Sequence, residues 1–217
     1  MDTALVFVHV TGGAFALVSG GLAMLARKGE AVHRLAGNVF FVAMLTMTIS
    51  AFVVAIIRDQ PINITASTVT FYMILTSWVA ATRRDGEIGR FETFALVGGL
   101  CALASAAVFA VTDKAAAPVH YVFGTIMAIA VLSDVHVVWR KGLSGAQRIA
   151  RHLWRMSFAM LVATGAYFAG QPEFVPAILR ETSLNFVPIV LVLVLLVYWL
   201  VRVSFTKWWN KEPHTAS

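Results

Sequence analysis

The chain has 217 residues, of which 59% are hydrophobic and only 13% are charged. Soluble domains carry about 25% charged residues, so this composition excludes an ordinary water-soluble domain and indicates a protein embedded in a lipid bilayer. The net charge is +6 at neutral pH, but no nucleic-acid-binding motif accompanies it. The basic side chains are therefore expected to meet anionic lipid headgroups rather than nucleic acid.

Apolar stretches long enough to cross a bilayer recur along the chain. A hydrocarbon core of about 30 Å needs roughly 20 apolar residues in helical conformation. We therefore predict an all-α polytopic membrane protein that forms a single domain over residues 1–217. Its seven predicted transmembrane helices cover residues 3–26, 33–57, 65–82, 91–112, 118–139, 149–169 and 184–204.

The basic residues are distributed unevenly between the two ends of these helices. Of the 17 Lys and Arg residues, all but Arg58, Lys114 and Arg180 fall around the first, third and fifth turns or near the C-terminal end. Cytoplasmic segments of membrane proteins are enriched in Lys and Arg. This distribution predicts that the basic side is cytoplasmic, with the N-terminus outside and the C-terminus inside.

Two histidines in the first two spans are each followed by a glycine one helical turn later, His9 by Gly13 and His33 by Gly37. Residues at i and i+4 lie on the same face of a helix. A glycine at i+4 leaves room beside the imidazole for a flat group, such as a haem ligated by that histidine. The alternative interpretation is that small residues let two membrane helices pack closely, without a cofactor.

The fifth span repeats the pattern, with His120 followed by Gly124. In the predicted topology His9 and His120 lie near the outer surface, and they are the predicted outer ligands of haem b. Three further histidines lie near the cytoplasmic surface: His33, His136 and His152. We expect His33 to form the inner pair with His152 or His136, and a quinone or another redox partner to exchange electrons with the haem. His120 and His136 are about 160° apart around one helix, so the fifth span is not expected to ligate two haems on one face.

Asp134 in the fifth span and Arg155 in the sixth are predicted to form a structural ion pair, since both lie within about two turns of the cytoplasmic surface. Arg151 precedes Arg155 by one turn. Alternatively, the two arginines hold an anion, such as a haem propionate or a lipid phosphate, or extend to the headgroups. Asp134 and His136 are about 200° apart around their helix, so one metal ion is not expected to use both.

Two spans resemble each other in sequence. The second contains "VHRLAGNVFFVAML" and the fifth contains "VHYVFGTIMAIAVL", which share V-H-x-x-x-G. The two spans run in opposite directions in the predicted topology. The likeness therefore predicts an inverted 3+3 repeat with a seventh span appended. The alternative is that two apolar helices are similar through composition alone.

The segments "FVHVTGG" and "ARKGEAVHRLAGNVFFVAML" resemble a bacterial family of predicted multi-span membrane proteins of unknown function. Its pattern is an early L/V-H in the first span and K-G-x-x-x-H-R-x-x-G at the start of the second. This resemblance implies an integral inner-membrane protein without a settled activity. A looser resemblance, to the cytochrome b561 and ferric-reductase group, implies haem and rests on histidines near both faces; the spacing of His120 and His136 departs from that group's pattern.

Three hypotheses for the function follow. The first is a b-type haem protein that carries electrons in or across the inner membrane, as a membrane cytochrome or oxidoreductase component. The alternative is a haem-free small transporter or sensor whose membrane histidines relay protons or bind a metal or a small ligand. The third, a structural subunit of a larger membrane complex, leaves the histidines unexplained. No G-x-S-x-G, H-E-x-x-H or phosphate-loop motif points to hydrolytic chemistry.

Overall fold

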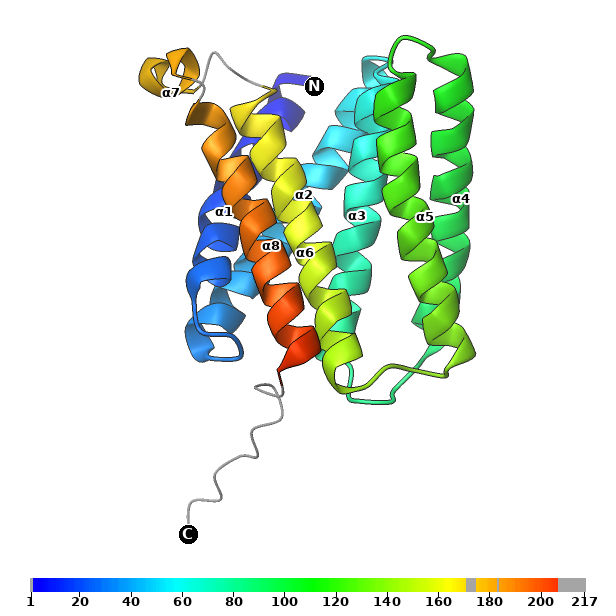
Figure 1. The fold of residues 1–217 in the computed structure, drawn as a ribbon. Coiled ribbons are helices and arrows are strands. Elements are labelled where there is room, and N and C mark those ends of the chain that lie inside the picture. The colour runs from blue at the N-terminus through cyan, green and yellow to red at the C-terminus, as the bar shows by residue number, and fades with distance from the viewer. Residues whose placement is uncertain (1, 171–174, 183, 207–217) are drawn as a thin grey trace.

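The computed structural model describes residues 2–170, 175–182 and 184–206, and within these ranges the chain is helical and contains no strand. The long helices are α1 (Asp2–Leu25), α2 (Ala31–Ile57), α3 (Pro61–Thr82), α4 (Arg90–Thr112), α5 (Ala117–Trp139), α6 (Gly145–Phe168) and α8 (Val187–Phe205). A short helix, α7 (Ala177–Glu181), and a 3-10 turn, η2 (Leu184–Phe186), lie between α6 and α8. Figure 1 shows the long helices side by side in one bundle. The all-α prediction is confirmed.

Six helices in the described part of the chain are long and apolar enough to cross a membrane: α1, α2, α3, α4, α5, and α8 with the turn before it. These six helices support a membrane-embedded protein. The remaining predicted span corresponds to α6, which has 24 residues but is not one of the six. Arg151, His152 and Arg155 lower the hydropathy of its first half, so α6 differs from the other long helices in polarity rather than in length.

Helix α3 occupies the centre of the bundle. It packs against α2 and α6 and also against α4 and α5. Helices α1 and α2 form one hairpin, α4 and α5 form a second, and α8 packs against α6. Although α5 and α6 follow each other in the chain, their described backbones do not pack closely, and α3 lies between them in the view of Figure 1. Side chains must therefore make the connection between α5 and α6.

Two apolar clusters fill the interior. One surrounds Met44 of α2 and Ala159 of α6. The other contains Met73 of α3, Met127 of α5 and Phe158 of α6. Flexible methionine side chains suit such irregular spaces between helices. Phe158 brings α6 into the second cluster, so the apolar side chains of α3, α5 and α6 meet in one region.

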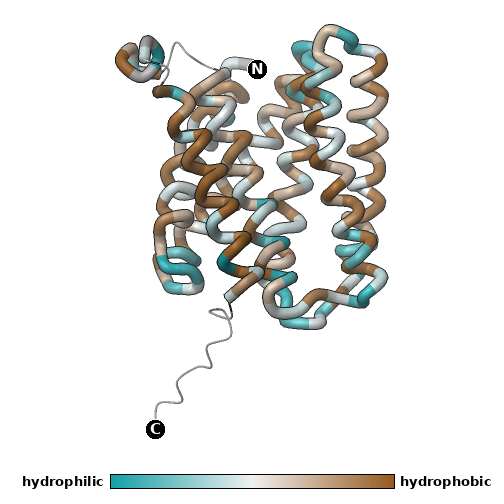
Figure 2. The backbone as a smooth tube through the Cα atoms, in the orientation of Figure 1, coloured by the Kyte–Doolittle hydropathy of each residue, from teal (hydrophilic) through white to brown (hydrophobic). Residues whose placement is uncertain are grey.

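The turns between α1 and α2, between α3 and α4 and between α5 and α6 all lie at one end of the bundle, opposite the start of α1 (Figure 1). Figure 2 shows hydrophilic segments at this end and mainly apolar segments along the helices. These turns contain the basic residues Arg27, Lys28, Arg83, Arg84 and Lys141. Helices α2 and α5 begin at opposite ends of the bundle (Figure 1), as an inverted repeat requires; the repeat itself stays a prediction.

Asp85 ties the α3–α4 turn to the start of α6. Its carboxylate accepts hydrogen bonds from the Gly145 N–H at 2.9 Å and from Arg148 Nε at 2.6 Å, and these bonds lower the pKa of Asp85 below its usual value. Gly142 has φ +124°, and a Cβ atom there would lie 2.7 Å from the Gly86 carbonyl oxygen. A glycine is therefore required where the α5–α6 turn crosses the α3–α4 turn. These contacts fix the position at which α6 enters the bundle.

Candidate functional site

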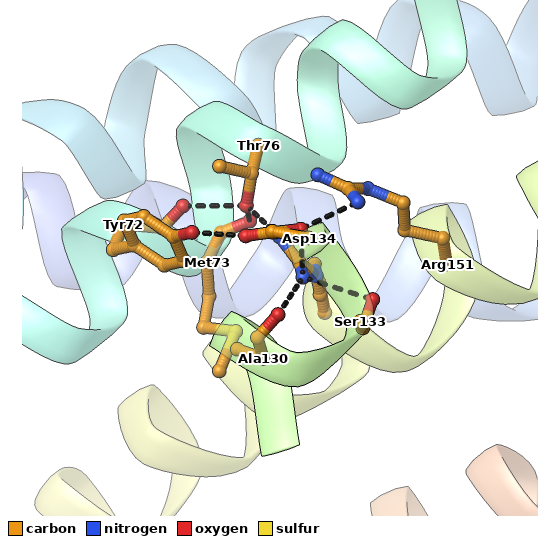
Figure 3. A network of polar contacts seen from close by, with 8 residues as sticks. Tyr72, Met73, Thr76, Ala130, Ser133, Asp134 and Arg151 are labelled. Carbon is orange, nitrogen blue, oxygen red and sulfur yellow. Dashed lines mark hydrogen bonds and ion pairs between the residues drawn. The ribbon is translucent and has the colours of Figure 1, made fainter. Parts of the chain in front are cut away.

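Three charged side chains are buried together near the basic end of the bundle. Asp134 lies on α5, and Arg151 and Arg155 lie one turn apart on α6; 2%, 7% and 0% of their surfaces are exposed, respectively. Ionisable groups inside a membrane protein are costly, so a buried group of three marks a candidate functional site. With Tyr72 and Thr76 of α3 they form what we call the charge network (Figure 3).

Arg155 is the most fully satisfied cation of the charge network. It donates from Nη2 to Asp134 Oδ1 at 2.7 Å and from Nη1 to Asp134 Oδ2 at 3.4 Å. Nη2 also donates to the Ala130 carbonyl oxygen at 3.0 Å, and Nη1 donates to Thr76 Oγ1. Such a forked pair is the strong form of an arginine–carboxylate contact. Arg155 thus connects α6 to both α5 and α3.

Arg151 contacts the same carboxylate, but with poorer hydrogen-bond geometry than Arg155. Its Nη1 lies 2.5 Å from Asp134 Oδ1, but the geometry is that of an ion pair, and the buried Nη1 makes no hydrogen bond of good geometry. Arg155 Nε is likewise buried without an acceptor. Two guanidinium groups therefore compete for one carboxylate, and the described network carries one excess positive charge when Asp134 is ionised.

Tyr72 completes the network from α3. Its hydroxyl donates a short hydrogen bond to Asp134 Oδ2. Arg155 Cζ lies 5.7 Å from the centroid of the Tyr72 ring and 5.3 Å from that of Trp154, within the range of cation–π attraction. A Cβ atom at Gly99 of α4 would lie 2.8 Å from the Tyr72 hydroxyl oxygen. The glycine therefore provides the space that the phenol occupies.

The predicted Asp134–Arg155 ion pair is present in this arrangement. The sequence predicts an anion or the headgroups as the partner of Arg151, whereas in the structure this side chain also contacts Asp134. Tyr72 and Thr76 were not predicted. They lie at i and i+4 on α3 and so share a face, but apolar membrane helices contain many such polar pairs, and only the packing of α3 against α5 and α6 shows which pair matters.

His9 and His33 each bond a backbone carbonyl oxygen on the neighbouring helix. His9 Nδ1 lies 3.0 Å from the Met47 oxygen, and His33 Nδ1 lies 2.9 Å from the Ala23 oxygen. Because a carbonyl only accepts hydrogen bonds, Nδ1 carries the proton in both neutral rings and Nε2 keeps a free lone pair. This is the tautomer that metal-ligating histidines adopt, and the same bonds join α1 to α2.

His120 has a different bonding pattern. Its side chain is fully buried, with Nδ1 2.9 Å from Thr65 Oγ1 and Nε2 3.4 Å from Asp113 Oδ2. A carboxylate cannot donate, so Nε2 carries the proton and Nδ1 accepts from the threonine hydroxyl. Neither nitrogen is free to bind iron. The expectation of an outer haem pair formed by His9 and His120 does not fit these contacts, which instead join α5 to α3 and to the α4–α5 turn.

The inner histidines also differ from one another. His152 Nδ1 lies 3.1 Å from Ser77 Oγ and 3.2 Å from the Ser77 carbonyl oxygen. His152 is close enough to His33 for an electrostatic interaction. His136 is exposed on α5, whereas α2 and α6 contribute Met44 and Ala159 to one apolar cluster. The inner pairing of His33 with His152 therefore agrees better with the arrangement than that of His33 with His136. Among the residues described, no three His, Cys, Asp or Glu side chains are grouped to hold a metal ion.

The three glycines that follow histidines have different surroundings. A Cβ atom at Gly13 would lie 3.4 Å from Met47 Sδ, and one at Gly124 would lie 3.8 Å from Ala106 Cβ, whereas one at Gly37 would have no neighbour within 4 Å. Gly13 and Gly124 thus face neighbouring helices at ordinary contact distance, as small residues in membrane helix pairs do. Gly37 alone of the three leaves open space on the histidine side of its helix.

The charge network provides one group, Asp134, whose protonation would change the charge balance between three helices, and two arginines that exceed it in charge. The histidines provide bonds between helices and, on α1 and α2, free imidazole lone pairs. Comparisons with family models, curated proteins and solved structures found no match to this chain.

Proposed function

We propose that this chain is a haem-free transporter or sensor of the bacterial inner membrane, and that the charge network is its functional centre. The proposal includes seven transmembrane helices, with the N-terminus outside and the C-terminus inside. The basic turns at one end of the bundle support this orientation, because Lys and Arg are enriched on the cytoplasmic side.

The assignment of α6 as the seventh span is supported by how its charges are placed. Arg155 is fully buried, and Arg151 nearly so, against α3 and α5. Charged side chains inside membrane proteins face the bundle interior and pair with one another. Helix α6 also packs against α3 and the apolar α8. Its low hydropathy therefore reflects an interior site rather than a position outside the bilayer.

A single observation carries the functional proposal: buried charges connect two helices whose backbones do not pack closely. In the described structure α5 is joined to α6 through the Asp134 ion pairs and through apolar contacts such as the Phe123–Phe158 ring pair, whose centroids are 6.2 Å apart. Protonation of Asp134 would remove the charge that attracts both arginines. The α4–α5 hairpin would then be less firmly held to α6. Binding of a proton or a ligand at this site would thereby cause the helices to move.

The experiment that tests this proposal measures the distance between α5 and α6. Spin labels are attached at Leu132 and Gln147, both exposed, in a background in which Cys101 is replaced by serine. We expect a narrow distance distribution for wild type and a longer or broader one for Asp134→Asn, which carries no charge at this position. The control is Asp59→Asn in the α2–α3 turn. The same distribution in wild type, Asp134→Asn and the control would rule out the charge network as a switch.

A second candidate function is electron transfer by haem b, and a specific observation favours it. The Nδ1 atoms of His9 and His33 are held by carbonyl oxygens, which leaves Nε2 free for iron. Haem, when bound, would supply the redox chemistry, and these two side chains would supply axial ligands. The test is a reduced-minus-oxidised absorption spectrum of the purified protein with haem supplied during expression. A sharp α-band that is lost in His33→Ala would favour the cytochrome; a colourless protein would exclude it.

A further inference from the structure

The charge network contains more positive than negative charge. Asp134 is the one carboxylate in contact with Arg151 and Arg155 in the described structure. The Tyr72 hydroxyl donates a hydrogen bond to that carboxylate, so it keeps its proton and adds no negative charge. An excess cation buried among membrane helices is unfavourable unless an anion balances it. One bound monovalent anion would neutralise the network.

The unused hydrogen-bond donors of the network belong to the two arginines. Arg155 Nε is buried without an acceptor. Arg151 Nη1 lies 2.5 Å from Asp134 Oδ1 but makes no hydrogen bond of good geometry there, so a better-placed acceptor could replace that contact. The Arg151 side chain retains 8% of its surface whereas that of Arg155 retains none, so an incoming group would reach Arg151 first. Arg151 lies six residues after Gly145, which places it about 9 Å along α6 from the basic end of the bundle. The more accessible arginine of the network is therefore also the one nearer the basic end, where anions would be attracted.

We propose that Arg151, assisted by Arg155, binds an oxyanion group, either a carboxylate or a phosphate, in competition with Asp134. Planar guanidinium groups match both kinds of oxyanion in geometry and charge. Asp134 and the bound anion would exchange as partners of Arg151, while Asp134 stays paired with Arg155 and keeps α5 joined to α6. This inference rests on the proposed function and specifies the ligand class of the same site. The oxyanion comes from a soluble metabolite or from a phospholipid headgroup.

The experiment titrates the full chain, purified in phospholipid-free detergent, with sodium acetate or sodium phosphate against a sodium chloride reference, and follows the thermal midpoint. Wild type should show a saturable rise. Arg151→Gln should weaken the apparent affinity by about tenfold or more, as expected for loss of a charge-assisted hydrogen bond. Asp134→Asn should bind more tightly than wild type, because the internal competitor is removed. Arg148→Gln is the matched control: it removes a cation on the same helix that pairs with Asp85 instead.

Arg151→Gln should weaken anion binding and Asp134→Asn should strengthen it. A purely structural role for these residues would not produce opposite effects on affinity. If Asp134→Asn binds no better than wild type, or Arg151→Gln and Arg148→Gln bind alike, the proposal is overturned. If Arg151→Gln does not fold, Arg151→Lys replaces it, since lysine retains the charge and lacks the planar guanidinium group. Unaltered affinity in that variant also overturns the proposal.

A second measurement distinguishes the source of the oxyanion. Native mass spectrometry of the protein from phosphatidylglycerol vesicles should show a retained lipid in wild type and not in Arg151→Gln if the headgroup is the ligand. Acetate or phosphate binding without lipid retention indicates a soluble anion. Absence of both defeats the inference, whereas the spin-label distances would still report on Asp134 as a switch, so the two proposals fail separately.

Discussion

The Tyr72 hydroxyl is the donor through which α3 reaches the Asp134 carboxylate. Tyr72→Phe removes this donor but leaves the ring and the arginine contacts in place. Because the other donors still satisfy the carboxylate, we expect a loss of about 1 to 2 kcal/mol in the free energy of unfolding. Chemical unfolding in micelles measures it, with Tyr121→Phe on the exposed surface of α5 as the control. Equal stability of the two variants would show that the hydroxyl contributes nothing to the fold.

The pairing of α3 with α4 depends on the absence of a side chain at Gly99. A Cβ atom there would lie 2.8 Å from the Tyr72 hydroxyl oxygen and 3.1 Å from Met127 Cε, whereas one at the adjacent Gly98 would have no neighbour within 4 Å. The phenol cannot move away without losing its bond to Asp134. Gly99→Ala is therefore expected to lower the free energy of unfolding by about 1 to 3 kcal/mol through overpacking. Gly98→Ala, the matched control, should leave stability the same or slightly higher; reversed effects would refute this account.

The junction between the α3–α4 turn and α6 should respond to acid. The pKa of Asp85 is lowered by the Gly145 N–H and Arg148, so this carboxylate stabilises the folded state above its unfolded pKa, and the contribution is lost as the pH falls through the folded pKa. The Asp85 side chain is 51% exposed, so we expect a contribution of less than about 1 kcal/mol. Thermal midpoints measured across the acidic range should converge for wild type and Asp85→Asn. A constant difference down to the lowest pH would contradict this.

For the molecule as a whole, hydropathy located most of the helices, because lipid imposes the same length and apolarity on each. The third span was predicted to begin at residue 65, but α3 begins at Pro61. Proline fits the first turn of a helix, where its missing N–H is not needed, so the polar residues around it belong to the helix although their hydropathy is low. Helix α6 is the opposite case: Arg151 and Arg155 are buried, and composition alone cannot distinguish them from surface charges.

Only those contacts of the site that involve a single pair of helices could be predicted from the sequence. Asp134 and Arg155 were matched from sign and depth, two quantities that can be read from sequence. Two other contacts of this carboxylate could not be predicted: the ion pair with Arg151 and the hydrogen bond from Tyr72. Both depend on how α3 packs between α5 and α6, and helical periodicity does not contain that information. The His9, His33 and His120 patterns look alike in sequence, but the hydrogen-bond partners of the three rings differ. The three rings have the same glycine spacing, but His120 alone faces a carboxylate.

The membrane topology can be tested at the two ends of α6. In a background in which Cys101 is replaced by serine, Arg140→Cys lies in the turn before α6, and Ala169→Cys lies directly after its last residue; both positions are exposed. If α6 crosses the bilayer with the basic end inside, a membrane-impermeant maleimide applied to intact cells should label Ala169→Cys. It should label Arg140→Cys only after the membrane is permeabilised. Labelling of both from the same side would place the two ends of α6 on one face of the membrane, and its buried arginines would then lie in a helix that dips into the bilayer without crossing it.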